Sequence, residues 1–152
     1  MKLSFFTFLF LIYQVALCQD KPETIRWITE KIDIYKNPIE SKMEIRDDYI
    51  YRISSSELRV KIKNIRKIAI KKSSYNSVDY STLELIFDAG KLEYKDASEL
   101  EFKTSKNKSD NKLSLTLLPS FLNDGLKDRM EKALVHLVKL FGGNAIIYKE
   151  PF

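Results

Sequence analysis

The chain has 152 residues, a formal net charge of +5 at pH 7 and 44% hydrophobic residues, with one cysteine and one histidine. This length and composition supply one ordinary hydrophobic core. So few cysteines and histidines exclude a zinc site built from those ligands and a disulfide-stapled scaffold.

The first segment has the pattern of a cleaved signal peptide. Lys2 gives a positive start, residues 3–13 form an apolar run, and Ala16-Leu17-Cys18 places small residues at the cleavage positions. The run is about eleven residues long, whereas a membrane-spanning helix needs roughly 20. We expect cleavage after Cys18, which removes residues 1–18 and leaves no membrane span in the mature chain.

Two alternatives for this segment are less well supported. A membrane anchor is disfavoured because the polar sequence that starts at Gln19 follows the apolar run abruptly. Lipid attachment at Cys18 is disfavoured because that route requires a small residue where Leu17 stands. The mature chain, 19–152, then has no cysteine, which favours a bacterial periplasm or surface. We therefore expect an exported protein, periplasmic or secreted, with a single domain.

A helix is predicted near residues 21–36. Asp20 and Glu23 have the spacing of a capping box, and Asn37-Pro38 ends the segment. An apolar stripe recurs at helical spacing through Ile25, Ile28, Ile32 and Tyr35.

The middle of the chain alternates apolar and polar residues, which is typical of half-buried strands. The alternating positions are Met43/Ile45, Tyr49/Tyr51/Ile53, Leu58/Val60/Ile62, Ile68/Ile70, Leu83/Leu85/Phe87, Leu92/Tyr94, Leu100/Phe102 and Leu113/Leu115/Leu117. Turn-forming residues separate these runs, as in Asp47-Asp48 and Asp88-Ala89-Gly90, so we expect neighbouring strands to be antiparallel.

A second helix is predicted at the C-terminal end. Asn123 has the position of an N-cap, and Gly142-Gly143 follows the last apolar turn. One face carries Leu126, Met130, Ala133, Leu134, Leu137, Leu140 and Phe141. So strong a stripe must pack against the strands.

The predicted fold class is therefore α+β: an N-terminal helix, seven to eight short antiparallel strands forming a bent sheet or partly open barrel, and an amphipathic C-terminal helix packed on it. Over residues 42–141 this element order resembles the pleckstrin-homology-like barrels. The strand-turn-strand run 58–72 is similar to that of bacterial members.

The whole chain also resembles small exported bacterial proteins of uncharacterised function. The resemblance rests on the signal segment ending at Gln19, on Ala133-Leu134-Val135-His136-Leu137 running into Phe141-Gly142-Gly143, and on the terminal Glu150-Pro151-Phe152. It implies no activity, cofactor or catalytic residue.

No catalytic constellation is supported by the sequence. His136 lies at the edge of the second helix's apolar stripe, where a packed boundary residue is expected. The carboxylate pairs Asp47-Asp48 and Glu99/Glu101 are typical of a turn and of a solvent-facing strand, although glycosidases do use two carboxylates. We expect no cofactor and no metal site, and an unrecognised hydrolase is the alternative function.

Two surface features are candidates for partner contact. Trp27 and Ile34 lie seven residues apart, on the side of the first helix opposite its apolar stripe. A partner chain could cover them there, or the tail 145–148 or the core could bury them, and burial is the preferred interpretation.

The second feature is a basic segment. Between Arg59 and Lys72 there are seven basic residues and no acidic residue, so the rest of the chain sums to −2. The candidate anion-binding residues are Arg59, Lys61, Lys63, Arg66, Lys67, Lys71 and Lys72. Alternation would place most of them on one face of two adjacent strands. Neutralisation by Glu57, Glu84 or Glu93, or protection of an edge strand by lysines, is the competing interpretation.

The sequence therefore favours a non-catalytic binding or structural module of the periplasm or cell surface. The expected partner is anionic: a lipid headgroup, an acidic glycan or an acidic protein face. Nucleic acid is disfavoured, because the exported chain does not meet intracellular nucleic acid and its basic strands lack interleaved exposed aromatic residues.

Overall fold

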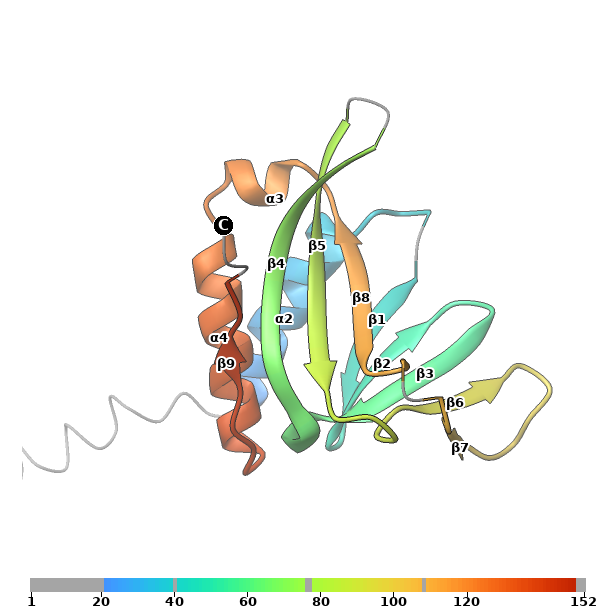
Figure 1. Cartoon of the computed structure of the whole chain (residues 1–152). Helices are drawn as coiled ribbons and strands as arrows, with labels where there is room; N and C mark the ends of the chain where they lie inside the picture. Colours follow the sequence, from blue (N-terminus) through green and yellow to red (C-terminus); the bar gives the residue numbers. More distant parts are fainter. Residues whose placement is uncertain (1–20, 40, 76–77, 108, 150–152) are drawn as a thin grey trace, which may run out of the picture.

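The computed structural model describes residues 21–39, 41–75, 78–107 and 109–149; the predicted signal peptide, 1–18, lies outside them. The described residues form an α+β fold with three α-helices, one 3-10 turn and nine strands (Figure 1). The strands form two sheets that do not close into a barrel. The predicted α+β class and antiparallel pairing are confirmed, whereas one continuous bent sheet is not found.

The first sheet has five antiparallel strands in the order β1-β2-β3-β6-β7. These strands are β1 (Lys42–Arg46), β2 (Tyr49–Ile53), β3 (Ser56–Lys61), β6 (Glu93–Asp96) and β7 (Lys103–Thr104). Arg46 pairs with Tyr49 across the two-residue turn at Asp47, whose φ of 54° is one that Asp tolerates. Alternation along β1 to β3 buries Met43, Ile50 and Val60.

The second sheet has four strands in the order β8-β5-β4-β9. These strands are β4 (Ile65–Tyr75), β5 (Val78–Phe87), β8 (Lys112–Leu117) and β9 (Ile146–Ile147). β4 and β5 form a long hairpin, and β8 adds to β5 antiparallel. The short β9 pairs with β4 in parallel, which the sequence did not predict.

The predicted pairing of the two basic strands is wrong. β3 and β4 lie in different sheets, and the 3-10 turn η1 (Ile62–Asn64) carries the chain between them. Ile62 is fully buried in this turn, where its N–H donates to the carbonyl oxygen of Asp48. Alternation predicted which side chains are buried, but both sheets bury theirs in the same core, so it did not identify the neighbouring strand.

The strand predicted at Leu100 and Phe102 is also wrong. Leu100 is 97% exposed, and pairing begins only at β7. Two alternating residues are a weak signal, and here they lie in the loop between β6 and β7.

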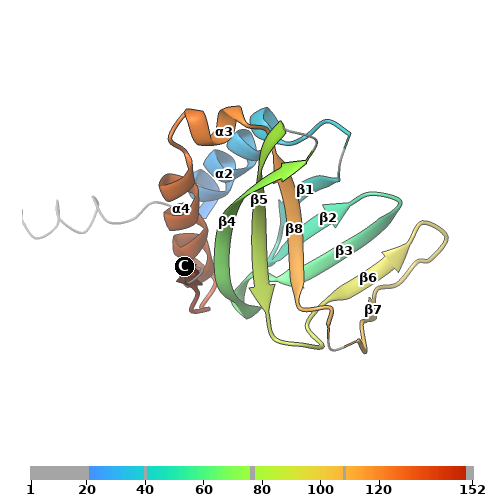
Figure 2. The ribbon, with the colours of Figure 1, turned by 45° about the horizontal axis from the view of Figure 1, so that its top comes forward.

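The helices are α2 (Lys21–Tyr35), α3 (Ser120–Asn123) and α4 (Lys127–Leu140). We expected one helix capped by Asn123, but Asn123 ends α3, and α4 begins after a turn. α2 and α4 lie side by side, with α4 against β4 and α2 against β1 (Figures 1 and 2). The helix pair therefore spans the gap between the two sheets on one side.

One hydrophobic core joins both sheets and the helices. α2 contributes Ile28 and Ile32, α4 contributes Leu134 and Leu137, and all four are at most 2% exposed. Phe121 of α3 is fully buried and makes an edge-to-face contact with Tyr35, with ring centroids 5.7 Å apart. Burial of Leu134 and Leu137 confirms that the stripe of the C-terminal helix packs inward.

Paired glycines end α4 in a tight turn. Gly142, at φ 76°, donates to the carbonyl oxygen of Lys139, and the Gly143 N–H donates to that of Val138. These two hydrogen bonds together form a Schellman motif. It brings Gly143 against the backbone of Lys63 in η1, so the motif also fixes where α4 meets the junction between the sheets.

Candidate functional site

Four of the seven predicted anion-binding residues are ion-paired. Their nitrogen-to-oxygen distances are 2.6 Å for Arg59 to Glu93, 3.1 Å for Arg66 to Asp88, 3.0 Å for Lys71 to Glu84 and 2.7 Å for Lys72 to Asp79. Two of these carboxylates, Glu84 and Glu93, belong to the set that the competing interpretation named. For these four residues the structure therefore favours neutralisation.

Arg59 and Lys61 lie on the five-stranded sheet among aromatic rings. The Arg59 guanidinium carbon is 3.7 Å from the ring centroid of Phe102 and 4.3 Å from that of Tyr49. Lys61 also contacts Tyr49, whose hydroxyl raises the pKa of the lysine by accepting its hydrogen bond. Stacked rings and Glu93 thus hold Arg59, and this cluster is separate from the lysines of β4.

On the four-stranded sheet, Glu84 is shared by two lysines. Its carboxylate lies 3.0 Å from Lys71 and 3.2 Å from Lys112. Burial alone would raise the pKa of Glu84, but hydrogen bonds from both lysines hold it below its ordinary value. Lys67, which lies four residues before Lys71 on β4, has its ammonium nitrogen 4.9 Å from the ring centroid of Tyr148.

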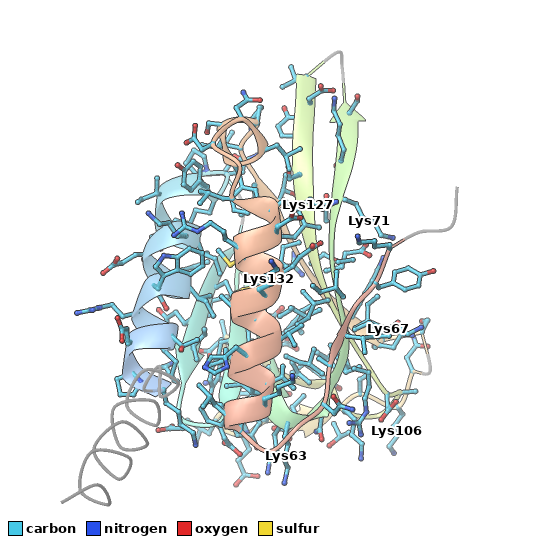
Figure 3. The ribbon with its side chains drawn as sticks, turned by 90° about the vertical axis from the view of Figure 1, so that its left-hand side faces the viewer. Lys63, Lys67, Lys71, Lys106, Lys127 and Lys132 are labelled. Carbon is cyan, nitrogen blue, oxygen red and sulfur yellow. The ribbon has the colours of Figure 1, made fainter. Side chains whose placement is uncertain are left out.

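A different basic surface runs along the side of the molecule where α4, β9 and β4 meet. Figure 3 looks onto this side, with Lys63, Lys67, Lys127 and Lys132 spread over it. We define the basic edge by six exposed lysines: Lys63, Lys67, Lys127, Lys132, Lys139 and Lys149. It combines two members of the predicted set with lysines from the C-terminal third of the chain.

Few acidic residues occur in the described segments that carry the basic edge. Residues 62–75 have no acidic side chain, and within α4 and 141–149 there are two, Asp128 and Glu131. Glu131 is 3% exposed, and its Oε1 accepts the Ile70 N–H at 3.1 Å, where the β4 edge extends beyond β9. The Glu131 carboxylate therefore accepts a hydrogen bond from an unpaired N–H group at the edge of β4, and it is buried beneath the lysines.

A hollow of about 330 Å³ lies within the basic edge, between α4 and β9. Lys132 and Lys139 line one side, and Ile146 and Ile147 line the other. Ile146 is 58% exposed, among the largest exposed hydrophobic residues in the described part of the chain. The surface is therefore amphipathic, with apolar side chains surrounded by lysines.

A second hollow, of about 400 Å³, lies between α2 and α4 and is lined by residues of both helices. We call it the interhelical groove, and its lining residues are Glu23, Thr24, Trp27, Arg129, Lys132, Ala133 and His136. The Arg129 guanidinium carbon lies 5.5 Å from the ring centroid of Trp27. Aromatic, basic and acidic side chains thus converge on one small volume.

Two buried polar atoms in the wall of this groove have no hydrogen-bond partner among the described residues. They are Oγ1 of Thr24, a residue that is 4% exposed, and Nε2 of His136. Within the described residues, Ser81 Oγ is the third such atom, and it lies on β5. Because buried polar groups are nearly always bonded, two orphaned atoms around one groove mark it as unusual.

The two predicted partner-contact residues have different surroundings. Trp27 is half-buried against the core and lines the interhelical groove, whereas Ile34 is 60% exposed. The tail that could have covered this side of α2 instead pairs with β4 as β9. Burial was thus the better interpretation for Trp27 but not for Ile34.

A third hollow, of about 890 Å³, opens beside the five-stranded sheet. Leu58, Leu92 and Tyr94 form its apolar part, and the loop that contains Ser105 and Asp110 borders it. In that loop the Ser105 hydroxyl donates to Asp110 at 2.5 Å, so local bonds already use these polar groups.

Within residues 21–39, 41–75, 78–107 and 109–149, no three His, Cys, Asp or Glu side chains are grouped so as to hold a metal ion. In the same part of the chain, no helix is both long and apolar enough to cross a membrane.

Comparisons with family models, with curated proteins and with solved structures all find no match. The resemblances drawn from the sequence therefore stay expectations, and a function must be argued from the geometry.

Sequence reasoning did not assign a site role to Thr24 or to the helical row Arg129, Lys132 and His136, and it interpreted His136 only as a packed boundary residue. A signal for Thr24 was present, because it occupies the apolar stripe of α2 four residues before Ile28. The row on α4 recurs at helical spacing, three and four residues apart. That this row faces α2 depends on how the helices pack, which one sequence does not show.

Proposed function

We propose that the chain is an exported, non-catalytic binding module that docks on an anionic membrane surface through its basic edge. The observation that carries the proposal is the exposed Ile146 beside Lys132 and Lys139. Lysines attract a layer of anionic headgroups, and an apolar side chain among them inserts at the headgroup boundary.

The combination of exposed lysines with the exposed Ile146 supports a membrane over an acidic glycan as the partner. The six lysines of the basic edge are exposed, and the nearby Glu131 is buried, so the surface presents positive charge over a broad area. An acidic glycan would satisfy the lysines but would gain little from Ile146. A lipid surface uses both.

Co-sedimentation with vesicles tests the proposal. The mature chain, 19–152, should bind vesicles rich in phosphatidylglycerol at low salt, bind less at physiological salt and not bind pure phosphatidylcholine. Each lysine near such a surface contributes about 1 kcal/mol, so Lys67→Gln combined with Lys139→Gln should weaken binding roughly 30-fold. Ile146→Asn should weaken it further.

Lys91→Gln combined with Lys106→Gln is the matched control. It removes the same charge from exposed positions outside the basic edge. If the control weakens binding as much as the edge variant, only net charge matters, and the proposed docking surface is wrong. Binding to an acidic polysaccharide but not to vesicles would also contradict the membrane as partner.

Export is a separate part of the proposal, supported by the signal-peptide pattern of residues 1–18. The intact mass of the protein from its native host should correspond to a chain that begins at Gln19. An acylated Cys18 would instead establish a lipid anchor, and a mass that includes unmodified residues 1–18 would contradict export with cleavage.

We also propose that the fold is related to the pleckstrin-homology-like barrels. The support is that an amphipathic C-terminal helix follows the main strands and packs over the gap between two sheets. A likeness of fold assigns no function, so the membrane proposal does not depend on it.

A further inference from the structure

The interhelical groove has the composition of a small-ligand site rather than of a docking surface. Its walls belong to two helices that the core holds rigidly, through Ile28 on α2 and through Met130 and Leu134 on α4. Its volume of about 400 Å³ falls within the range of small-molecule sites, roughly 300–1,000 Å³. The groove therefore suits a compact molecule that enters between fixed walls.

The two polar atoms without partners show that the groove lacks a hydrogen-bond acceptor, which a ligand could supply. A buried hydroxyl without a partner is destabilising, because it loses its bonds to water on folding and gains none in return. Thr24 Oγ1 can donate to an acceptor in the groove, and His136 Nε2 can do so when it carries a proton. An oxygen-rich group would satisfy both.

The charges around the groove favour a negative ligand. Arg129 and Lys132 supply two cationic groups, and Glu23 supplies one carboxylate on the exposed rim. Arg129 projects a guanidinium, whose planar donors suit a carboxylate or phosphate. The net charge of the groove lining is therefore positive, near the buried donors Thr24 and His136.

Trp27 and Ala133 add an apolar wall to this set of donors. We propose that the interhelical groove binds a small organic anion, in which a carboxylate or phosphate meets Thr24, Arg129 and Lys132 while a compact apolar group lies against Trp27. The groove adjoins the hollow of the basic edge, because Lys132 and His136 line both, but the other five edge lysines do not line the groove.

The chain supplies a local reporter for the test, because Trp27 is its single tryptophan. Titration of the mature chain, 19–152, with phenyl phosphate should change the fluorescence of Trp27 in a saturable manner and raise the melting temperature. Inorganic phosphate, which lacks the apolar group, and benzyl alcohol, which lacks the charge, should each bind at least tenfold more weakly.

Thr24→Val separates a binding role from a structural one. The substitution keeps the shape of the side chain and removes an unpaired buried hydroxyl, so the free protein should melt at the same temperature or higher. Affinity for phenyl phosphate should nevertheless fall roughly tenfold, since a hydrogen bond to a charged group is lost. A merely structural hydroxyl would leave the affinity unchanged.

Arg129→Gln should also weaken phenyl phosphate binding and reduce its dependence on salt. Arg26→Gln is the matched control: Arg26 is exposed on α2, pairs with Glu30 at 4.0 Å and does not line the groove, so affinity should be unchanged. The proposal is overturned if phenyl phosphate produces no saturable change, if Thr24→Val or Arg129→Gln leaves affinity intact, or if benzyl alcohol binds equally well. Neither substitution touches the basic edge lysines, so this test and the vesicle test can fail independently.

Discussion

At the scale of single residues, Gly143 is where the C-terminal turn of α4 meets the backbone of η1. A Cβ added there would lie 2.7 Å from the Lys63 carbonyl oxygen and 2.7 Å from Val138 Cγ1. The Lys63 backbone cannot yield as a flexible side chain would. Gly143→Ala should therefore lower the free energy of unfolding by about 1–3 kcal/mol, as overpacking does. Urea denaturation measures this loss.

Asn144→Ala is the control for that prediction. Asn144 is the next residue along the chain and is exposed, so its truncation should change the free energy of unfolding by less than about 0.5 kcal/mol. Equal stability of the two variants would mean that the contact between α4 and η1 is looser than described.

Glu131 predicts how stability changes with pH. Burial raises the pKa of its carboxyl above the ordinary value of 4.5; the Ile70 N–H and the nearby Lys127 and Lys149 lower it, and Asp128 raises it. The folded state thus holds this proton more tightly than the unfolded state does. Its contribution is present below pH 4.5 and is lost as pH rises through the raised pKa.

Glu131→Gln keeps an acceptor for the Ile70 N–H and removes the titration. The variant should gain stability relative to the parent as pH rises from about 4 to 7, measured by urea unfolding at each pH. A difference between the two proteins that stays constant over this range would show that the carboxyl does not titrate differently on folding.

At the scale of elements, prediction succeeded where burial is one-sided. The stripe of α2 and the alternation of β1 and β8 identified buried residues, because each of these elements has one face on the core. Prediction named the row Tyr49, Tyr51 and Ile53 in β2, but Ile50 on the opposite face is fully buried, and only Tyr51 of the named row is buried. It failed for β9, which has two residues, and for Leu100, which lies in a loop. Short elements are determined by their neighbours, and sequence periodicity needs more than two residues to be detected.

The central contribution of α4 to the core can be tested at Leu137. This side chain is fully buried, so Leu137→Ala should lower the free energy of unfolding by about 2–5 kcal/mol through lost contacts and a cavity. Lys139→Ala, on the exposed side of the same helix, should change it by less than about 0.5 kcal/mol. A Leu137→Ala variant that melts with the parent would place α4 at the periphery.

At the scale of the whole molecule, the sequence predicted the fold class but not the division into two sheets. Ile62 continues the alternation of β3, and Ile68 and Ile70 alternate in β4, yet the turn between the two strands moves the chain from one sheet to the other. Most of the seven basic residues were predicted to share one face for the same reason. The interhelical groove could not be predicted, because it depends on the packing of α2 against α4.

The shared core predicts that the two sheets and the helix pair unfold together. α2 and α4 contact opposite sheets, and η1 joins β3 to β4 with Ile62 fully buried, so no part keeps its apolar surface covered if another opens. Urea unfolding followed by Trp27 fluorescence, which reports the helix pair, should coincide with unfolding followed by far-ultraviolet circular dichroism, which also reports the strands. Leu137→Ala should shift both curves by the same amount. A Trp27 transition at lower urea than the strand signal would instead mean that the helices detach before the sheets unfold, and the core would then be two units rather than one.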